Sequence, residues 1–418
     1  MSVGIVGAGV IGLSIGFELA EAGHDVTVFD AGQAGGSASA MNAGWVAPFL
    51  STPRAAPGIL KDALGGLKKT EGPLKFQLRP DIGFAGWGAR FLISSSRRRS
   101  ARTTTALHAL ATHAPRHFDQ LLERGVEFEH HRDGLGVVFQ HAQNLENYRD
   151  VTQKMHRLGY AGTTSVYQGS EIADFDPAIS RSAAGVIHLE DERHVRPESL
   201  SQGLATALTG QGGELQEDRQ VLRIERAPNA RWTMITATGA RRVFDRLVIA
   251  AGFYSRELLK PLGIRLPLEA AKGVSLTARG EGVLPQHPLK LFEKMVASSP
   301  YDGEIMRFSG TFDVGDRSEV VSKKRLDMVV RDALEFFESW SPREVEKERA
   351  GHRPTSADDA PLIGAIPRHD GLYVATGHGT LGVTLGPVTA ALVARELSTG
   401  KAEALLWPFR PNRFRLVF

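Results

Sequence analysis

The chain has 418 residues, enough for two domains, and its 42% hydrophobic and 23% charged residues are typical of globular proteins. It contains no cysteine, which excludes disulfides, thiolate metal sites and cysteine nucleophiles. The formal net charge of +3 is weak evidence for a polyanionic partner, and no stretch is long and apolar enough to span a bilayer.

The first thirty residues predict a strand, a glycine-rich turn, a helix and a second strand that ends at Asp30. Gly7 permits a tight turn, Gly9 allows close backbone approach, and Gly12 lets the helix pack against the strand. The amides at the helix start face a pyrophosphate, while the acid accepts hydrogen bonds from ribose hydroxyls. The pattern therefore predicts a dinucleotide site. Asp30 disfavours the 2′-phosphate of NADP, but the motif alone does not separate FAD from NAD.

The rest of the chain alternates between helical and strand patterns. Residues 35–44 form a small, polar loop that can lie against a flat ligand. Helices are expected up to about residue 124 and at 144–158, 198–209, 323–340 and 383–399. Strands are expected as a pair within 126–139, turned at Arg132–Gly134, and at 220–225, 232–238, 244–252, 272–277, 294–298, 304–311 and 372–376.

The densest basic cluster, at residues 94–102, contains Arg97, Arg98 and Arg99. A solvated helix end is the favoured interpretation. The alternative is a docking patch for an anionic membrane surface or an acidic redox partner. Since the glycine motif begins so early that no secretory signal fits before it, we expect a cytoplasmic protein, with peripheral contact to the inner face of the membrane as an open alternative.

Several motifs together resemble the D-amino acid oxidase/glycine oxidase (DAO) superfamily of FAD enzymes, and its bacterial D-amino acid dehydrogenase branch in particular. Besides the first glycine motif and Asp30, the matching segments are residues 39–44, 248–252, 272–277, 307–312, 351–354, 361–364 and 377–387. The first motif is shared by many folds. The pairing of Arg353-Pro354 with the later run Gly-His-Gly-Thr-Leu-Gly is far more specific.

The resemblance implies an α/β fold in which both domains are discontinuous. A Rossmann-like FAD-binding domain is expected from residues 1–80, 180–262 and 348–418. An α+β substrate domain, built on a large mixed sheet, is expected from residues 81–179 and 263–347. The flavin ring would lie at the junction of the two.

The resemblance also assigns roles to individual residues. Arg353 would grip the substrate carboxylate with two parallel donors, the alternative being a structural arginine at a strand end. His378 would touch substrate or flavin, or only bond its own loop. Lys272 would lie near flavin or substrate, or be an exposed lysine at a strand start. The residues expected to contact FAD are Gly7, Ala8, Gly9, Val10, Ile11, Gly12, Asp30, Ala31, Ser37, Asn42, Ala43, Gly44, Val221, Ala250, Ala251, Gly252, Gly364, Gly379, Thr380, Leu381, Gly382, Val383 and Thr384.

Some of these positions carry stated alternatives. Asn42 could equally satisfy its own backbone in a turn, and Val221 could be an ordinary core valine. Thr380 stands where glycine-oxidase-like members place a second arginine. No tyrosine lies around Met295 and Val296, and Tyr301 is expected in the following turn. Both departures favour the dehydrogenase branch.

The function implied is FAD-dependent oxidation of a D-amino acid, such as a small or cyclic one like D-proline or hydroxy-D-proline. The α-hydride would go to flavin N5, giving an imino acid or 2-oxo acid plus ammonia, with a quinone or redox protein as acceptor. No nucleic acid and no metal is expected. The alternatives are an oxygen-using oxidase of glycine, sarcosine or another secondary amine, an amine-oxidising domain acting on modified RNA, and a flavoprotein without enzymatic activity.

Overall fold

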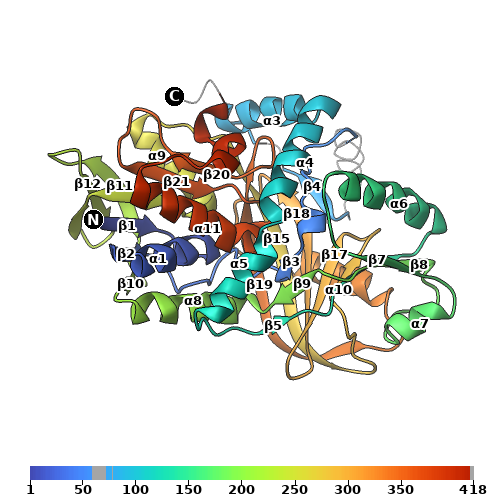
Figure 1. The fold of residues 1–418 in the computed structure, drawn as a ribbon. Coiled ribbons are helices and arrows are strands. Elements are labelled where there is room, and N and C mark those ends of the chain that lie inside the picture. Colours follow the sequence, from blue (N-terminus) through green and yellow to red (C-terminus); the bar gives the residue numbers. More distant parts are fainter. Residues whose placement is uncertain (59–71, 78, 415–418) are drawn as a thin grey trace.

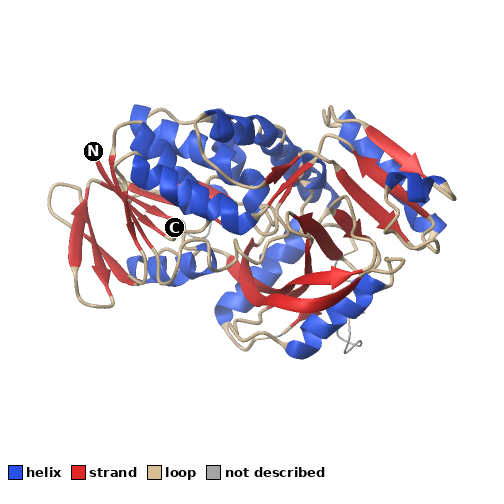
Figure 2. Cartoon of the chain, turned by 90° about the horizontal axis from the view of Figure 1, so that it is seen from below, coloured by secondary structure: helices blue, strands red, loops and turns tan. Residues whose placement is uncertain are grey.

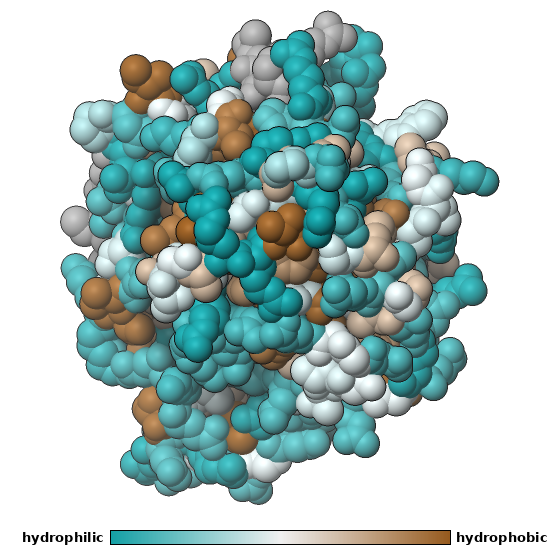
Figure 3. Space-filling view, turned by 90° about the vertical axis from the view of Figure 1, so that its left-hand side faces the viewer, coloured by the Kyte–Doolittle hydropathy of each residue, from teal (hydrophilic) through white to brown (hydrophobic). Residues whose placement is uncertain are grey.

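The computed structural model describes residues 1–58, 72–77 and 79–414 of the chain. Figure 1 shows the N-terminal elements, in blue, packed beside the C-terminal ones, in red, on one side of the molecule, with the large sheet beside them. Helices lie directly against the sheets (Figure 2). The face in Figure 3 is mainly polar, with apolar side chains scattered over it. The fold therefore joins segments that are far apart in the sequence.

A six-stranded sheet receives both ends of the chain. Its pairings are parallel, except that the edge strand β20 is antiparallel to β21. Three helices, α1 (Val10–Glu21), α8 (Pro197–Gly210) and α11 (Gly382–Thr399), pack on it around one core. In spatial order its strands are β10 (Glu214–Gln216), β2 (Asp25–Phe29), β1 (Ser2–Val6), β14 (Arg246–Ile249), β21 (Leu372–Thr376) and β20 (Leu362–Ala365).

A nine-stranded mixed sheet forms the second layer. Helix α10 (Lys323–Leu334) packs on one face of it, in a core that includes Phe308 and Trp340. In spatial order its strands are β19 (Ser341–Ser356), β15 (Leu268–Glu281), β18 (Ile305–Val314), β17 (Val296–Tyr301), β16 (Leu289–Leu291), β6 (Leu135–Phe139), β8 (Gly185–Leu189) and β7 (Thr164–Tyr167), with β4 (Leu74–Phe76) paired to β18.

The remaining elements connect these layers. Two small sheets consist of β11 (Val221–Arg226), β12 (Trp232–Thr236) and β13 (Arg241–Phe244), and of β3 (Trp45–Val46), β9 (Arg193–Val195) and β5 (His130–His131). The other helices are α3 (Ile82–Ser94), α4 (Arg97–Ala111), α5 (Ala114–Glu123), α6 (Ala142–Arg157), α7 (Glu171–Phe175) and α9 (Ser255–Leu259). Short 3-10 turns are η1 (Pro48–Leu50), η2 (Gly252–Tyr254), η3 (Lys260–Leu262), η4 (Ala404–Phe409) and η5 (Pro411–Arg413). Within the described ranges, every helix is too short or too polar to cross a membrane.

The predicted fold class is confirmed, but three local predictions are wrong. The strands within 126–139 do not pair, because β5 bonds to β9 while β6 bonds to β16 and β8. The helix expected over 323–340 ends at Leu334, and the apolar residues after it are buried as loop. Tyr301 is the last residue of β17, not part of the following turn. Periodicity reports burial, and burial occurs outside regular elements too.

The expected domain boundaries differ from the strand pairing. Strands β4 and β8, placed with the cofactor domain, pair within the large sheet. Helices α4 and α5, placed with the substrate domain, pack in the same core as α1 and α11. The expected boundaries come from motifs, which are local in the sequence. Strand pairing and helix packing instead join segments that are far apart in the sequence. The division into two discontinuous domains remains our proposal.

Candidate active site

The N-terminal glycine turn has the geometry that its sequence predicts. Gly7 has φ +107°, and a Cβ there would lie 2.5 Å from the Ala250 carbonyl oxygen. A Cβ on Gly12 would lie 1.8 Å from the Gly7 carbonyl oxygen, so no side chain fits between helix and strand. The N-cap Gly9 of helix α1 has no side chain, the first turn holds no acid, and Val10 N donates to Ser39 Oγ (3.0 Å). The positive dipole end of α1 thus has no charged partner and favours an anion such as a pyrophosphate, which fits a bound dinucleotide.

Asp30 lies at the end of β2 and shapes this turn. Its Oδ2 accepts a hydrogen bond from Ala8 N (2.6 Å), and its Oδ1 accepts one from Gly32 N (2.9 Å). Burial raises the pKa of Asp30, and these backbone donors oppose the shift. Arg219 N donates to the Asp30 carbonyl oxygen (2.7 Å), which brings the segment leading to Val221 to the same place. Val221 then begins β11 and packs at the edge of a core.

The loop after β2 is held by the large sheet. Three consecutive carbonyl oxygens, of residues 41–43, accept side-chain hydrogen bonds from β17 and β18. The donors are Ser309 Oγ to Met41 (3.0 Å), Arg307 Nη1 to Asn42 (3.2 Å), and Ser299 Oγ and Tyr301 Oη to Ala43 (2.8 Å each). The roles of these donors were missed from the sequence, although the segment 307–312 stood out as a motif. Their partners lie hundreds of positions away.

Asn42 acts as a turn residue and also reaches the C-terminal loop. Its Oδ1 accepts from Gly44 N (2.7 Å), and its Nδ2 donates to the Thr380 carbonyl oxygen at 3.5 Å. Gly44 has φ +81°, and a Cβ there would lie 1.9 Å from the Val195 carbonyl oxygen. The structure therefore brings the N-terminal loop and the C-terminal glycine turn together.

A second contact joins the same segments at the start of α11. Thr384 Oγ1 donates to the Trp45 carbonyl oxygen (2.9 Å). Leu381 precedes the helix, Gly382 and Val383 are its first residues, and Gly379 before it has φ +55°. Backbone amides at this helix start carry positive partial charge beside the residue 42–45 loop.

His378 is buried in this turn and is 4% exposed. Its Nε2 lies 3.2 Å from Thr389 Oγ1 of α11, and its backbone bridges to Thr355. Burial lowers the pKa of His378 to about 3, so the imidazole is neutral at any ordinary pH. The side chain ties the turn to its own helix.

Arg353 lies on β19, directly opposite Ala271 of β15. Its Nη1 donates to the Thr311 carbonyl oxygen (2.8 Å), and its Cζ lies 5.9 Å from the centre of the Phe312 ring. A Cβ on Gly273 would lie 2.2 Å from Arg353 Nη1, so this glycine makes the space for the guanidinium. Burial, and then the nearby charge of Arg54, lower the pKa of Arg353 to about 9. Such a site favours an anion.

Arg353 shares its sheet face with the loop after β2. Gly351 is two positions earlier on the same strand, so it faces the same side. A Cβ on Gly351 would lie 3.3 Å from Ala38 Cα and 3.4 Å from Met41 Sδ. The guanidinium of Arg353 and the loop after β2 are therefore neighbours on one face of the sheet.

Thr311 is strained beside Arg353. It is β-branched yet has φ +59°, at an irregularity in the β15–β18 pairing. Its Oγ1 is buried and has no hydrogen-bond partner within the described residues. Strain of this kind costs about 1–3 kcal/mol and concentrates at functional sites. Thr311 lies within the motif segment 307–312, but its positive φ could not be read from the sequence.

Lys272 does not lie beside Arg353. It pairs with His352 in the sheet, so its side chain is on the opposite face. It is 3% exposed, and its Nζ lies 3.3 Å from Asp316 Oδ2. The exposed-lysine alternative is wrong, because the residue is inside the long strand β15 rather than at its start.

Some residues expected at the cofactor are placed elsewhere or carry no side-chain contact. Gly364 lies in the edge strand β20, where a Cβ would be 2.2 Å from Arg410 Nη1, and Arg410 pairs with Glu396. Ala31 and Ser37 are exposed in turns. Ala250, Ala251 and Gly252 follow β14, and the first of them supports the Gly7 turn through its backbone. The close approach of Arg410 thus explains the glycine at position 364 without any cofactor contact.

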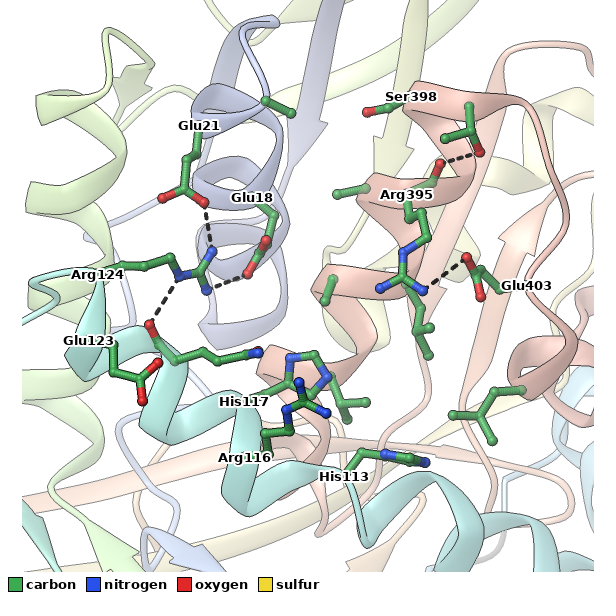
Figure 4. A pocket seen from close by; sticks show the side chains of 18 residues that line it. Glu18, Glu21, His113, Arg116, His117, Glu123, Arg124, Arg395, Ser398 and Glu403 are labelled. Carbon is green, nitrogen blue, oxygen red and sulfur yellow. Dashed lines mark hydrogen bonds and ion pairs between the residues drawn. The ribbon is translucent and has the colours of Figure 1, made fainter.

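A groove of about 880 Å³ between α1, α5 and α11 contains none of the predicted site residues (Figure 4). Its charges are largely paired with each other. Arg124 bonds both Glu18 and Glu21 at 2.7 Å, and Arg395 lies 3.4 Å from Glu403. This groove is separate from the face that carries Arg353.

Comparison with known proteins agrees with this geometry. D-amino acid dehydrogenase from Chromohalobacter salexigens is 32% identical over 420 residues, covering 97% of each chain. D-amino acid dehydrogenase from Methylobacterium sp. (strain 4-46) is 30% identical over 425 residues, covering 99% of each. Both matches extend over nearly the whole chain.

Solved structures show the same fold at lower identity. Glycine oxidase from Geobacillus kaustophilus matches with a TM-score of 0.76 and 23% identity over 98% of both chains. L-proline dehydrogenase from P. horikoshii matches with a TM-score of 0.73 and 14% identity over 99% of this chain and 98% of that one. At these identities the likeness shows the fold alone.

The model of the family "DAO: FAD dependent oxidoreductase" matches residues 2–396. FAD is accordingly the cofactor, and it fits the N-terminal end of α1, which has no acid in its first turn, and the two glycine turns. The chain belongs to the DAO family of FAD-dependent oxidoreductases.

Proposed function

We propose that this protein is a D-amino acid dehydrogenase, which oxidises its substrate at the α-carbon and passes electrons to an acceptor other than oxygen. The observation that carries the proposal is the position of Arg353, whose guanidinium lies on the same sheet face as the loop after β2. Within the described part of the chain, only its Nη1 makes a hydrogen bond, so donors remain for a carboxylate. The names of the full-length relatives support the D-configuration.

The residues of the chain would bind and orient rather than transfer protons. Arg353 would hold the α-carboxylate and so direct the α-hydrogen toward the cofactor. Burial lowers the pKa of His378 to about 3 and its Nε2 is engaged by Thr389, so it is a weak base. Lys272 is on the other face, so neither residue is placed to take a proton. FAD, when bound, supplies the hydride acceptor. The amides at the start of α11 would stabilise negative charge that develops on reduction.

The product would be an imine, which water hydrolyses to a 2-oxo acid and ammonia. With a cyclic substrate such as D-proline or hydroxy-D-proline, the imine would remain in the ring. Nothing in the contacts around Arg353 requires a primary amine, so both kinds of substrate belong in the same panel.

The decisive experiment is anaerobic reduction of the bound flavin by paired D- and L-amino acids. We expect the yellow absorbance to bleach with D-enantiomers and not with L-enantiomers. A protein purified with FAD that fails to bleach with a broad D-panel, including D-proline, would overturn the proposal. Bleaching by glycine or sarcosine alone would favour the amine-oxidase alternative.

The electron acceptor is tested separately. We propose a quinone or a redox protein, since the relatives are named dehydrogenases. Reoxidation of the bleached enzyme by a soluble quinone should then be much faster than reoxidation by air. Stoichiometric hydrogen peroxide at a comparable rate would instead identify an oxidase.

We also propose that the corner between α3 and α4 contacts an anionic membrane surface. Leu92 and Ile93 are exposed at the end of α3, and Arg97, Arg98 and Arg99 are exposed at the start of α4. Apolar and basic side chains side by side suit the boundary of anionic lipid headgroups. Co-sedimentation with vesicles containing phosphatidylglycerol should fall with salt and with R97E/R98E/R99E. Equal sedimentation with neutral vesicles would contradict the proposal.

A further inference from the structure

A second arginine lies beside Arg353. The Cζ of Arg54 is 4.3 Å from the centre of the Phe312 ring, the same ring that Arg353 approaches to 5.9 Å. The charge of Arg54 also contributes to lowering the pKa of Arg353. Two guanidinium groups, from a loop near the N-terminus and from β19, thus converge on one aromatic side chain.

Arg54 lacks the partners that a deeply placed guanidinium needs. Its Nε is buried without a hydrogen-bond partner, and no side-chain hydrogen bond or ion pair of Arg54 is found among the described residues. Its backbone N donates to Asp359 Oδ2 (2.6 Å). Burial lowers the pKa of Arg54 and the charge of Asp359 opposes that shift, although the two side chains form no ion pair within the described residues. Leaving a charged donor unpaired costs several kcal/mol, so an arrangement of this kind anticipates an anion.

A third cation faces the same side of the sheet. Lys290 of β16 pairs with Ala297, which pairs with Ser309, and Ser309 bonds the loop that lies over this face. Its Nζ lies 5.5 Å from the Tyr148 ring, and no acidic partner is found for it in the part of the chain that the structure describes. Burial, and then the charge of Arg54, lower the pKa of Lys290 to about 8.

Other cations near this sheet have acidic partners. Arg349, four positions before Arg353 on β19, lies 3.2 Å from Glu198, an acid that it shares with Arg307 of β18, and Arg325 of α10 is paired with Asp313. Arg54, Lys290 and Arg353 form no ion pair within the described residues, so this face of the sheet carries excess positive charge even with Asp359 nearby. One α-carboxylate can satisfy one bidentate guanidinium and leaves the other without a partner.

We propose that Arg54, assisted by Lys290, binds a second carboxylate on the substrate, so that the preferred substrates are acidic D-amino acids of the D-glutamate or D-aspartate type. This inference rests on the proposed function, because it assigns the α-carboxylate to Arg353. It adds no chemical step. The side-chain carboxylate stays intact while the α-carbon is oxidised.

The test compares D-glutamate with D-norvaline, an uncharged substrate of similar length, in the holoenzyme. The wild type should have the higher kcat/KM with D-glutamate. R54Q should lower the ratio of the two kcat/KM values by about 100-fold, as expected when one member of a buried charge pair is lost. R54K should keep part of the preference, and R124Q, at the groove of Figure 4, should leave the ratio unchanged. Equal losses for both substrates would place Arg54 at the α-carboxylate and overturn the proposal.

A binding measurement separates this inference from the proposed function. Glutarate and butyrate lack the amine, and each can be titrated against the flavin absorbance of the holoenzyme. Glutarate should bind at least about tenfold more tightly, and K290Q and R54Q should each reduce that difference. Equal affinities would overturn the second carboxylate site even if D-amino acids bleach the flavin. Preferential glutarate binding without bleaching by any D-amino acid would keep the site and reject the dehydrogenase.

Discussion

At the scale of single residues, the site is marked by polar side chains without hydrogen-bond partners and by a glycine that leaves space for one of them. Arg353 makes one hydrogen bond, Arg54 makes none through its side chain within the described ranges, and Thr311 has an unpaired hydroxyl. Gly273 has no side chain where one would collide with Arg353. These absences all lie together, which is the physical sign of a site that a ligand completes.

Replacing Arg353 should weaken substrate binding without weakening cofactor binding. We expect R353A to raise KM for the best D-amino acid about 100-fold, a loss of about 3 kcal/mol, because a charge-assisted pair of hydrogen bonds is lost. The FAD content should not change, since no side-chain hydrogen bond joins Arg353 to either glycine turn within the described residues. Steady-state kinetics together with the ratio of flavin to protein absorbance give both numbers. Unchanged kinetics would remove Arg353 from the mechanism.

Filling the space beside the Arg353 guanidinium should also raise KM. In G273A the new Cβ would lie 2.2 Å from Arg353 Nη1, so the guanidinium must move. We expect KM to rise about tenfold, in line with the usual cost of 1–3 kcal/mol for overpacking. G88A is the matched control, because no atom lies within 4 Å of its new Cβ on α3. It should leave KM unaltered. A G273A enzyme with wild-type KM would show that Arg353 does not need its present position.

At the scale of elements, β17 and β18 do more than form a sheet. Their side chains fix three successive carbonyl groups of the loop after β2, and two donors share the Ala43 oxygen. A loop of small residues has little packing of its own, so its shape depends on these hydrogen bonds. The strands of the large sheet thereby hold the surface on which the flavin would rest.

The two donors to Ala43 should be redundant. We expect Y301F to weaken FAD binding only a few-fold, because Ser299 still satisfies the oxygen. S299A should weaken it somewhat more, because Trp45 Nε1 also loses its acceptor. The double variant leaves that buried carbonyl group unpaired and should lose more than the sum of the two single effects. Flavin fluorescence during dialysis or titration measures the affinity. Strict additivity would mean that the two hydroxyls act on different groups.

A buried acid next to η1 should make stability depend on pH. Glu192 is 1% exposed, its Oε1 accepts from Phe49 N (2.9 Å), and burial raises its pKa to about 8. The folded protein therefore binds a proton that the unfolded chain releases at about pH 4.5, so stability falls as pH rises from about 5 to 8. We expect Tm to decrease by about 5 °C over this range. E192Q should flatten the slope. A steeper slope in E192Q would contradict the assignment.

At the scale of the whole molecule, function depends on closing the chain on itself. Helices α1 and α11 share a core (Figure 1). The loop after β2 is bonded to the turn before α11 through Asn42–Thr380, and to α11 itself through Trp45–Thr384. The large sheet carries Arg353 on β19, the residue that we propose to bind substrate. A cofactor placed there touches the beginning, middle and end of the sequence, so its binding should strengthen the whole fold.

The sequence by itself determined the local structure: the strand, turn and helix around Gly7 and Gly12, the acid at Asp30, and the helices of regular periodicity. Backbone sterics of glycine and the burial of one helix face act over a few residues, so they can be read locally. Only the tertiary structure decided that β6 pairs within the large sheet while β5 pairs with β9. It also decided that Lys272 and Arg353 lie on opposite sheet faces, and that Arg54 lies beside Phe312. Strand partners, sheet faces and unpaired charges arise from contacts between distant residues, for which the chain carries no local signal.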